Sequence, residues 1–217
     1  MARRIAPIAA TFAATAALLI TACGGGDDSS SPDDIKGADT GSKSPSASAS
    51  ASTPSEAKRP EITLPSTFQL TFEDWTSSEP VEQAILNDAK EEVRAGYAAI
   101  IANEPDGGDA LAFYDTENGL AQSTKWIKSY TDKNVTVIGE LPAFDPKVSM
   151  ADSGKAASLS YCTDESKAFT KNRKTGKEVG NPAGTDPEVA YTATLVKSAQ
   201  GVWQNDSVTA QRGGCSQ

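Results

Sequence analysis

Histidine is absent from this chain of 217 residues. Its absence excludes Ser-His-Asp and Cys-His catalysis, zinc sites with histidine ligands, and the side chain that most often acts as a general base near neutral pH. Aromatic residues are few, at 6%, and 20 Lys and Arg stand against 29 Asp and Glu. Because the resulting net charge is −9, nucleic acid is not expected as a partner.

The longest apolar run lies near the N-terminus. Arg3 and Arg4 precede residues 5–20, which are apolar apart from two threonines, and small residues lead up to Cys23. This pattern resembles the signal sequence of bacterial lipoproteins, in which the cysteine receives acyl chains such as palmitate and becomes the mature N-terminus. A transmembrane anchor is the alternative, but the run is short for a bilayer core of about 30 Å and contains Pro7. Sec and twin-arginine export are both compatible with this leader.

A low-complexity segment follows the leader. Residues 1–22 are the predicted signal peptide, and residues 23–60 consist largely of Ser, Ala, Gly, Asp and Pro. Such a composition cannot bury enough apolar surface to offset the entropy of ordering, so we expect a flexible tether that spans roughly 35 Å. Residues 61–217 then form a single folded domain. The expected location is the extracytoplasmic face of the cell membrane, with the lipid on Cys23 as the membrane contact, because anionic phospholipid repels an acidic domain.

Two cysteines are left once Cys23 is assigned to the lipid. Cys162 and Cys215 are an even pair in an oxidising compartment, where disulfides persist. A bridge between them would close a loop of about 50 residues and stabilise the domain by about 4 kcal/mol. The alternative is two free thiols, with Cys162 in a strand and Cys215 near an exposed terminus. Paired cysteines leave no thiol nucleophile.

The first part of the domain predicts one extended segment and one long helix. Alternation over residues 68–72 indicates the extended segment, and Pro80 opens a helix that ends at Asn103. An apolar stripe repeats at every fourth residue of this helix and comprises Val81, Ile85, Ala89, Val93, Tyr97 and Ile101. The opposite face is acidic, and we expect it to be solvated rather than to form a site. It carries Glu82, Asp88, Glu91, Glu92 and Arg94.

The rest of the domain changes from helical to extended periodicity. Shorter helical segments are predicted at 111–114 and 120–130, and alternation of period two begins at Val135. Strands are expected at 135–139, 157–162, 189–196 and 202–208. Helices followed by antiparallel strands predict an α+β domain, with the helices packed on one face of a curved antiparallel sheet.

The element order and several short motifs resemble known proteins. One long helix, two shorter helical pieces and a bent meander that ends at Gly201-Val202-Trp203 resemble the nuclear transport factor 2-like fold, a cone-shaped α+β fold that includes SnoaL-type cyclases and ketosteroid isomerases. A set of short motifs is similar to a group of actinobacterial secreted lipoproteins of undefined activity. The set comprises Leu64-Pro65, Leu70-Thr71-Phe72, the Ser-Tyr-Cys-Thr-Asp-Glu-Ser-Lys run at 160–167, Gly201-Val202-Trp203 and Gly213-Gly214-Cys215. The resemblance implies the fold and the disulfide, and it implies no reaction.

The resemblance to the nuclear transport factor 2-like fold implies a cavity between the helices and the sheet. We expect the cavity of this chain to be lined by Trp126, Tyr130, Tyr161, Leu195 and Trp203. An isomerase or cyclase of this kind without histidine would use an aspartate of raised pKa and a tyrosine donor. The candidates are Tyr97, Tyr114, Tyr130, Tyr161 or Tyr191 with Asp115 or Asp164. The alternative places the tyrosines in the core and the aspartates at turn caps, because none lies in a pattern specific to those enzymes.

Three further patterns are assigned to structure rather than to chemistry. Ser166 and Lys167 are neighbours on an extended segment, so they point to opposite faces and form no nucleophile pair. Asp106 and Asp109 supply too few oxygen ligands for calcium. A basic cluster is interpreted as a solvated hairpin, with contact to an anionic wall polymer or an acidic partner as the alternative. The cluster comprises Lys167, Lys171, Arg173, Lys174 and Lys177.

The sequence therefore predicts a lipid-anchored extracytoplasmic module that binds a small apolar ligand, a protein partner or a second copy of itself. The first alternative is a small histidine-free lyase or isomerase, and the second is a structural spacer at the cell envelope. No catalytic residue, metal site or cofactor is assigned.

Overall fold

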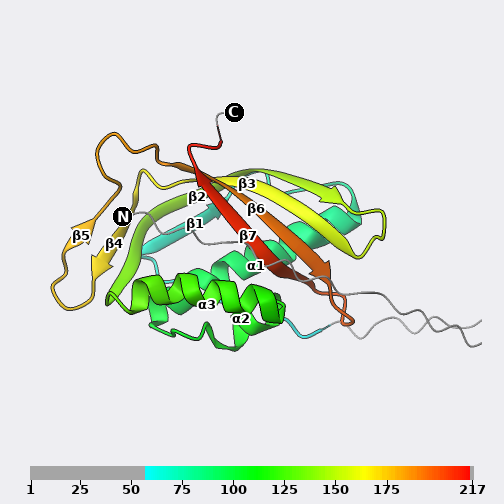
Figure 1. Cartoon of the computed structure of the whole chain (residues 1–217), viewed down its shortest axis with the longest axis horizontal. Helices are drawn as coiled ribbons and strands as arrows, with labels where there is room; N and C mark the ends of the chain where they lie inside the picture. Colours follow the sequence, from blue (N-terminus) through cyan, green and yellow to red (C-terminus); the bar gives the residue numbers. More distant parts are fainter. Residues whose placement is uncertain (1–56, 216–217) are drawn as a thin grey trace, which may run out of the picture. The chain divides into compact units, whose positions relative to one another are not determined.

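The computed structural model describes residues 57–215 (Figure 1). The predicted signal peptide, Cys23 and most of the predicted tether lie outside the described residues. Within this range the elements run in the order β1 (Phe68–Phe72), α1 (Pro80–Ala102), α2 (Gly108–Tyr114), α3 (Glu117–Thr131), β2 (Val135–Met150), β3 (Ala156–Asp164), β4 (Ala168–Asn172), β5 (Glu178–Val179), β6 (Glu188–Lys197) and β7 (Trp203–Arg212). The predicted α+β architecture is confirmed. The basic segment expected as a solvated hairpin forms β4 and β5.

The seven strands form one sheet in the order β5-β4-β2-β3-β6-β7, and β1 pairs with β2. The β1–β2 pairing is parallel, whereas the consecutive pairs along the rest of the sheet are antiparallel. β2 pairs with β4 over its first five residues and with β3 over its C-terminal part. A single long strand therefore connects the two ends of the sheet.

Two irregularities along β2 bend the sheet. Gly139 has a φ of 96°, and a Cβ there would lie 2.1 Å from the carbonyl oxygen of Lys167, so only glycine fits. Farther along, the β2–β3 register shifts between Phe144 and Lys147, and Asp145 has a φ of 53°. Bulges of this kind increase local twist and curl a sheet around the layer packed against it. The three helices gather on one side of this curled sheet (Figure 1).

The ends of the helices follow local sequence signals. α1 begins at Pro80, as predicted, and ends at Asn103, whose φ of 62° turns the chain left-handed. The Asn103 N–H donates to the carbonyl of Ile100. At the start of α3, Thr116 Oγ1 accepts the Gly119 N–H at 3.1 Å and caps the helix.

The prediction that the acidic face of α1 is solvated is wrong for two of its residues. Asp88 is 1% exposed, and its Oδ1 accepts from Arg59 Nε at 2.8 Å. Its Oδ2 accepts the backbone N–H of Trp203 at 2.9 Å. Glu92, one turn later, lines a cavity that is described below. The sequence pattern failed here because α1 is covered on more than its apolar stripe.

The buried side chains fall into two clusters. One contains Phe68, Ile100, Leu111, Ile127 and Val137 and joins the three helices to β1 and β2. The other contains Trp75 and Trp203 and joins the N-terminal half of α1 to β3, β6 and β7. The cavity described below is lined by side chains of both clusters, among them Tyr97 of the first and Tyr161 of the second.

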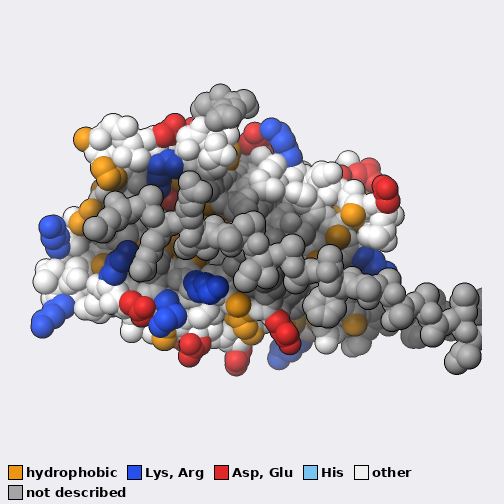
Figure 2. Space-filling view, viewed as in Figure 1, with side chains coloured by type: hydrophobic (Ala, Val, Ile, Leu, Met, Phe, Trp, Pro, Cys, Tyr) orange, Lys and Arg blue, Asp and Glu red, His pale blue; other side chains and the backbone are white. Residues whose placement is uncertain are grey.

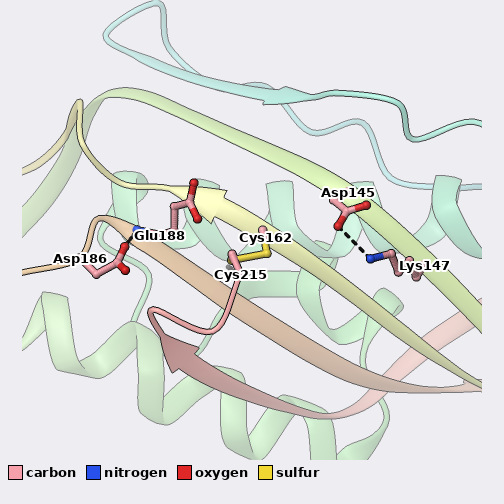
Figure 3. The surroundings of a disulfide bond; sticks show 6 residues. All are labelled: Asp145, Lys147, Cys162, Asp186, Glu188 and Cys215. Atoms are coloured by element: carbon pink, nitrogen blue, oxygen red, sulfur yellow. Dashed lines mark hydrogen bonds and ion pairs between the residues drawn. A yellow bond between two sulfur atoms is a disulfide. The ribbon is translucent and has the colours of Figure 1, made fainter. Parts of the chain in front are cut away.

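The predicted disulfide is confirmed. Cys162 on β3 is bonded to Cys215, which follows β7, and their Cα atoms lie 6.0 Å apart (Figure 3). Since β6 lies between β3 and β7, the C-terminal segment must cross β6 to reach β3. Gly214 makes that crossing over Ala190, where a Cβ on the glycine would lie 3.0 Å from the alanine Cβ.

A search for bilayer-spanning helices within residues 57–215 finds none of sufficient length and apolar character. Among these same residues, no three Cys, Asp or Glu side chains are grouped as potential metal ligands.

Candidate functional site: a cavity between the helices and the sheet

A cavity of about 290 Å³ opens between α1, α3 and the strands β3, β6 and β7. Its lining comprises Glu92, Val93, Gly96, Tyr97, Gln122, Ser123, Trp126, Tyr161, Thr163, Tyr191, Val208 and Ala210. Most of the wall is apolar or aromatic, and a few polar groups interrupt it. This is the usual composition of a small-molecule site, in which apolar surface supplies affinity and polar groups supply orientation.

The spacing of the lining residues follows the period of each element. On α1 and α3 they lie three or four residues apart or adjacent, and on the strands they alternate, as in Tyr161 and Thr163 or Val208 and Ala210. Gly96 leaves room for the indole of Trp126, because a Cβ at Gly96 would lie 2.9 Å from the ring. Ala210 is exposed, so the β7 side of the cavity forms its rim.

Four aromatic rings from four elements meet around the cavity. Tyr97 of α1 contacts Trp126 of α3 edge to face, with ring centroids 5.2 Å apart. Tyr161 of β3 stacks on Tyr191 of β6 at 5.1 Å. Burial raises the pKa of the Tyr97 and Tyr161 hydroxyls well above the usual value and that of Tyr191 to about 12. All three tyrosines are therefore neutral hydrogen-bond donors at physiological pH.

Glu92 is the carboxyl group of the cavity lining, and sequence reasoning missed it. Burial raises the pKa of Glu92 well above its usual value, and the negative charge of Asp115 raises it further. Glu92 also raises the pKa of Tyr161, so the two side chains are close enough to interact electrostatically. Its position beside the stripe residue Val93 is the one local signal that could have indicated a partly buried side chain.

Asp115, one of the predicted carboxylates, lies behind the cavity wall. It is buried, and its Oδ1 accepts from Asn205 Nδ2 at 3.1 Å. Burial raises the pKa of Asp115 to about 6, although hydrogen bonds from Ser123 and Asn205 act in the opposite direction. Ser123 lines the cavity and thus separates it from Asp115. The other predicted carboxylate, Asp164, accepts the Ser166 N–H at 2.8 Å and caps a turn.

The five residues expected to line the cavity fall into three places. Trp126 and Tyr161 are on its wall. Tyr130 lines a second cavity of about 240 Å³, which it shares with Tyr97. Leu195 and Trp203 are 1% and 0% exposed and belong to the core cluster around Trp75, so their side chains face packed neighbours. Tyr114, a further donor candidate, is likewise fully buried in the core, where burial raises its pKa to about 12.

Three members of the basic cluster, Lys167, Lys171 and Arg173, have ordinary structural partners. Lys167 Nζ pairs with Glu140 at 3.0 Å, while Ser166 is exposed. Lys171 pairs with Glu178 at 3.0 Å, and Arg173 donates to the carbonyls of Ile100 and Ile101 at the end of α1. Figure 2 shows basic, acidic and hydrophobic side chains interspersed on the visible part of the face over β4, β5 and the helices.

No family model and no curated protein matches the sequence. Among solved structures, Aln2 from a Streptomyces species is similar with 14% identity and a TM-score of 0.44, over 63% of this chain and 94% of that one. A ketosteroid isomerase-like protein from Erwinia carotovora atroseptica is similar with 17% identity and a TM-score of 0.41, over 64% and 99%.

A nuclear transport factor 2-like superfamily protein from Salmonella enterica is similar with 15% identity and a TM-score of 0.40, over 59% of this chain and 90% of that one. Structures of the predicted fold are thus among those similar to this chain. At these scores the similarities indicate nothing of what this chain binds.

Proposed function

We propose that this protein is a lipid-anchored extracytoplasmic module that binds a small, largely apolar ligand in the cavity between α1, α3 and the sheet. The observation that carries the binding function is the cavity itself, with about 290 Å³ enclosed by four aromatic rings and a few polar groups. Apolar and aromatic walls interrupted by a few polar groups are typical of sites that bind small molecules.

The anchoring part of the proposal comes from the leader sequence. Cys23 follows a basic start, an apolar run and small residues, which is the order that lipoprotein processing requires. In a bacterial host, we expect the wild-type chain in the membrane fraction and the Cys23→Ser chain released from it with its domain still folded. A Cys23→Ser chain that stays bound as firmly as wild type contradicts the anchor.

The binding function can be tested with a neutral fluorescent probe such as N-phenyl-1-naphthylamine. We expect its emission to rise on addition of the protein, and we expect Ala210→Trp to weaken binding at least tenfold, because the indole would fill the rim of the cavity. Thr209→Trp is the matched control, since adjacent strand residues face opposite sides of the sheet. Binding that is equal in both variants, or absent from wild type, contradicts the proposal.

A second candidate function is proton transfer by a small lyase or isomerase, and the position of Glu92 favours it. A carboxyl of raised pKa shares one cavity with three neutral tyrosine hydroxyls, which can donate to a developing oxyanion. Exchange of an enolisable proton of a bound ketone with deuterium, followed by NMR, tests this function. Exchange that is unchanged by Glu92→Gln excludes it.

A further inference from the structure

The charge balance of the cavity is one-sided. Its lining contains the carboxyl of Glu92, and none of the twelve lining residues is Lys or Arg. Behind the wall, Asp115 adds a second acidic group that acts on Glu92. Glu92 is partly buried, and a carboxyl in such a place without a basic partner is costly to ionise, so the protonated form is favoured in the free protein. The cavity therefore lacks the positive charge that would complete an ion pair.

The aromatic lining supplies the other half of a site for a cation. Tyr97, Trp126, Tyr161 and Tyr191 reach the cavity from α1, α3, β3 and β6, so π systems line the same cavity as Glu92 on several sides. The faces of such rings attract ammonium groups, most strongly where water is excluded. An apolar wall also favours a nitrogen that carries alkyl substituents. Such an ammonium group is less strongly hydrated than a primary ammonium, so it loses less solvation on entering the cavity.

We propose that the ligand is an alkylated organic cation, whose ammonium group is held among the four aromatic rings and beside Glu92. The inference rests on the proposed ligand-binding function and names the chemical class of its ligand. An anionic ligand is disfavoured, because either carboxyl group would repel it once ionised, and the domain around them is acidic as well.

Binding of a fixed cation is coupled to a proton. When the cation arrives, the Glu92 carboxyl ionises and its proton passes to solvent, so one positive charge enters as another leaves. The titratable groups facing Glu92 are Asp115 behind α3, Tyr97 on its own helix, Tyr161 on β3 and Tyr191 on β6. α3 contributes Gln122, Ser123 and Trp126, and β7 contributes Val208 and Ala210, none of which titrates. Affinity for the cation should consequently rise with pH until Glu92 is ionised in the free protein.

The test compares two probes of the same shape. Benzyltrimethylammonium carries a fixed positive charge, and neopentylbenzene replaces its nitrogen with carbon. Displacement of N-phenyl-1-naphthylamine from the full domain measures both. At pH 8 we expect the cation to bind at least tenfold more tightly than its neutral isostere, and we expect the advantage to shrink as the pH falls to 6.

A matched pair of variants assigns the effect to the cavity. Glu92→Gln should lose about tenfold in affinity for the cation and much less in affinity for neopentylbenzene. Glu91→Gln makes the same change of charge one residue away on α1, at a side chain that is 36% exposed, and should leave both affinities unchanged. Calorimetry in two buffers of different ionisation enthalpy should show proton release for wild type and none for Glu92→Gln.

The outcomes separate the inference from the function on which it rests. If the neutral isostere binds as tightly as the cation, or if Glu92→Gln leaves cation binding unchanged, the inference is overturned and the binding function stands. The same holds if the fluorescent probe binds and the cation does not displace it. If none of the three molecules binds, the proposed function fails together with the inference.

Discussion

Asp88 is a buried carboxylate that joins three parts of the domain. It lies on α1, binds Arg59 from the segment before β1, and accepts the backbone N–H at the start of β7. Removing it leaves the Trp203 N–H without an acceptor and Arg59 without this ion pair. We expect Asp88→Ala to lower the free energy of unfolding by about 3 kcal/mol, measured by urea denaturation.

Asn87→Ala is the control for this substitution, because Asn87 is the adjacent, exposed residue of the same helix. We expect a change within about 0.5 kcal/mol there. Equal effects of the two substitutions would mean that the interactions of Asp88 contribute little to stability.

Asp115 makes stability depend on pH in a direction opposite to that of most aspartates. Its pKa rises from 3.8 in the unfolded chain to about 6 in the folded one, so the folded state holds the proton more tightly. The stabilisation is complete below about pH 4 and is lost as the pH rises through 6, with a magnitude of about 3 kcal/mol. Glu92, whose pKa is also raised, extends the loss to higher pH.

Urea denaturation at several pH values tests this dependence. We expect the decrease between pH 4 and 6.5 to be clearly smaller in Asp115→Asn, because the amide has no proton to lose over this range. Asp106→Asn, at an exposed turn, should retain the wild-type decrease. A wild-type stability that instead rises over this pH interval would contradict the assignment.

The junction between α2 and α3 is held against β7 at very short range. Thr116 N–H donates to the Asn205 carbonyl, and a Cβ on Gly119 would lie 2.1 Å from that same oxygen. We expect Gly119→Ala to destabilise the domain by about 2 kcal/mol, since the clash with backbone outweighs the gain in helix propensity. Thermal unfolding followed by circular dichroism measures the loss.

Gly96→Ala is the matched helical control. Its new Cβ would meet the end of the Trp126 side chain, which is 36% exposed and can shift. The stability change should therefore stay below about 1 kcal/mol in either direction. The assignment fails if Gly96→Ala is as destabilising as Gly119→Ala.

The bounds of several elements could be predicted from the sequence, but the burial of polar positions on them could not. The start and end of α1 follow from Pro80 and Asn103, and alternation located β3 and β6 to within a residue or two. Asp88 and Glu92 were misassigned because part of their environment is made by β7, whose residues lie more than a hundred positions away in the chain. Periodicity describes the helix alone, and so it carries no information on which polar position a distant strand will cover.

At the scale of the whole molecule, the disulfide closes the C-terminal end of the fold. The Cys162–Cys215 bridge spans 53 residues and fixes the end of β7 across β6 to β3. We expect Cys215→Ser to lower the free energy of unfolding by about 4 kcal/mol, measured by chemical denaturation. Addition of a reductant should cause a similar loss in wild type and none in Cys215→Ser.

The composition of the cavity explains why the site was harder to predict than the fold. Trp126 and Tyr161 were named from the sequence, but Leu195 and Trp203 proved to be core residues of the same apolar character. Whether a large apolar side chain faces a void or a packed neighbour depends on the curvature of the sheet, which is set at Gly139 and at the bulge after Phe144. Hydrophobicity alone does not distinguish these two environments.

The attachments of residues 57–67 determine how the domain would respond to a mechanical load. If the chain is held at its N-terminus by a lipid, any pull on the domain is applied first to this segment. Arg59 forms an ion pair with Asp88, and the Ile62 carbonyl accepts from Arg94 Nη2 at 2.9 Å. Asp88 and Arg94 both lie on α1. Beyond them, β1 runs parallel to β2, so a force along β1 loads its hydrogen bonds together in shear rather than one after another. Under such tension the contacts of Arg59 and Ile62 and the β1–β2 pairing would be loaded first, and because both contacts end on α1, the helix that carries Glu92, part of the load would act on a wall of the cavity.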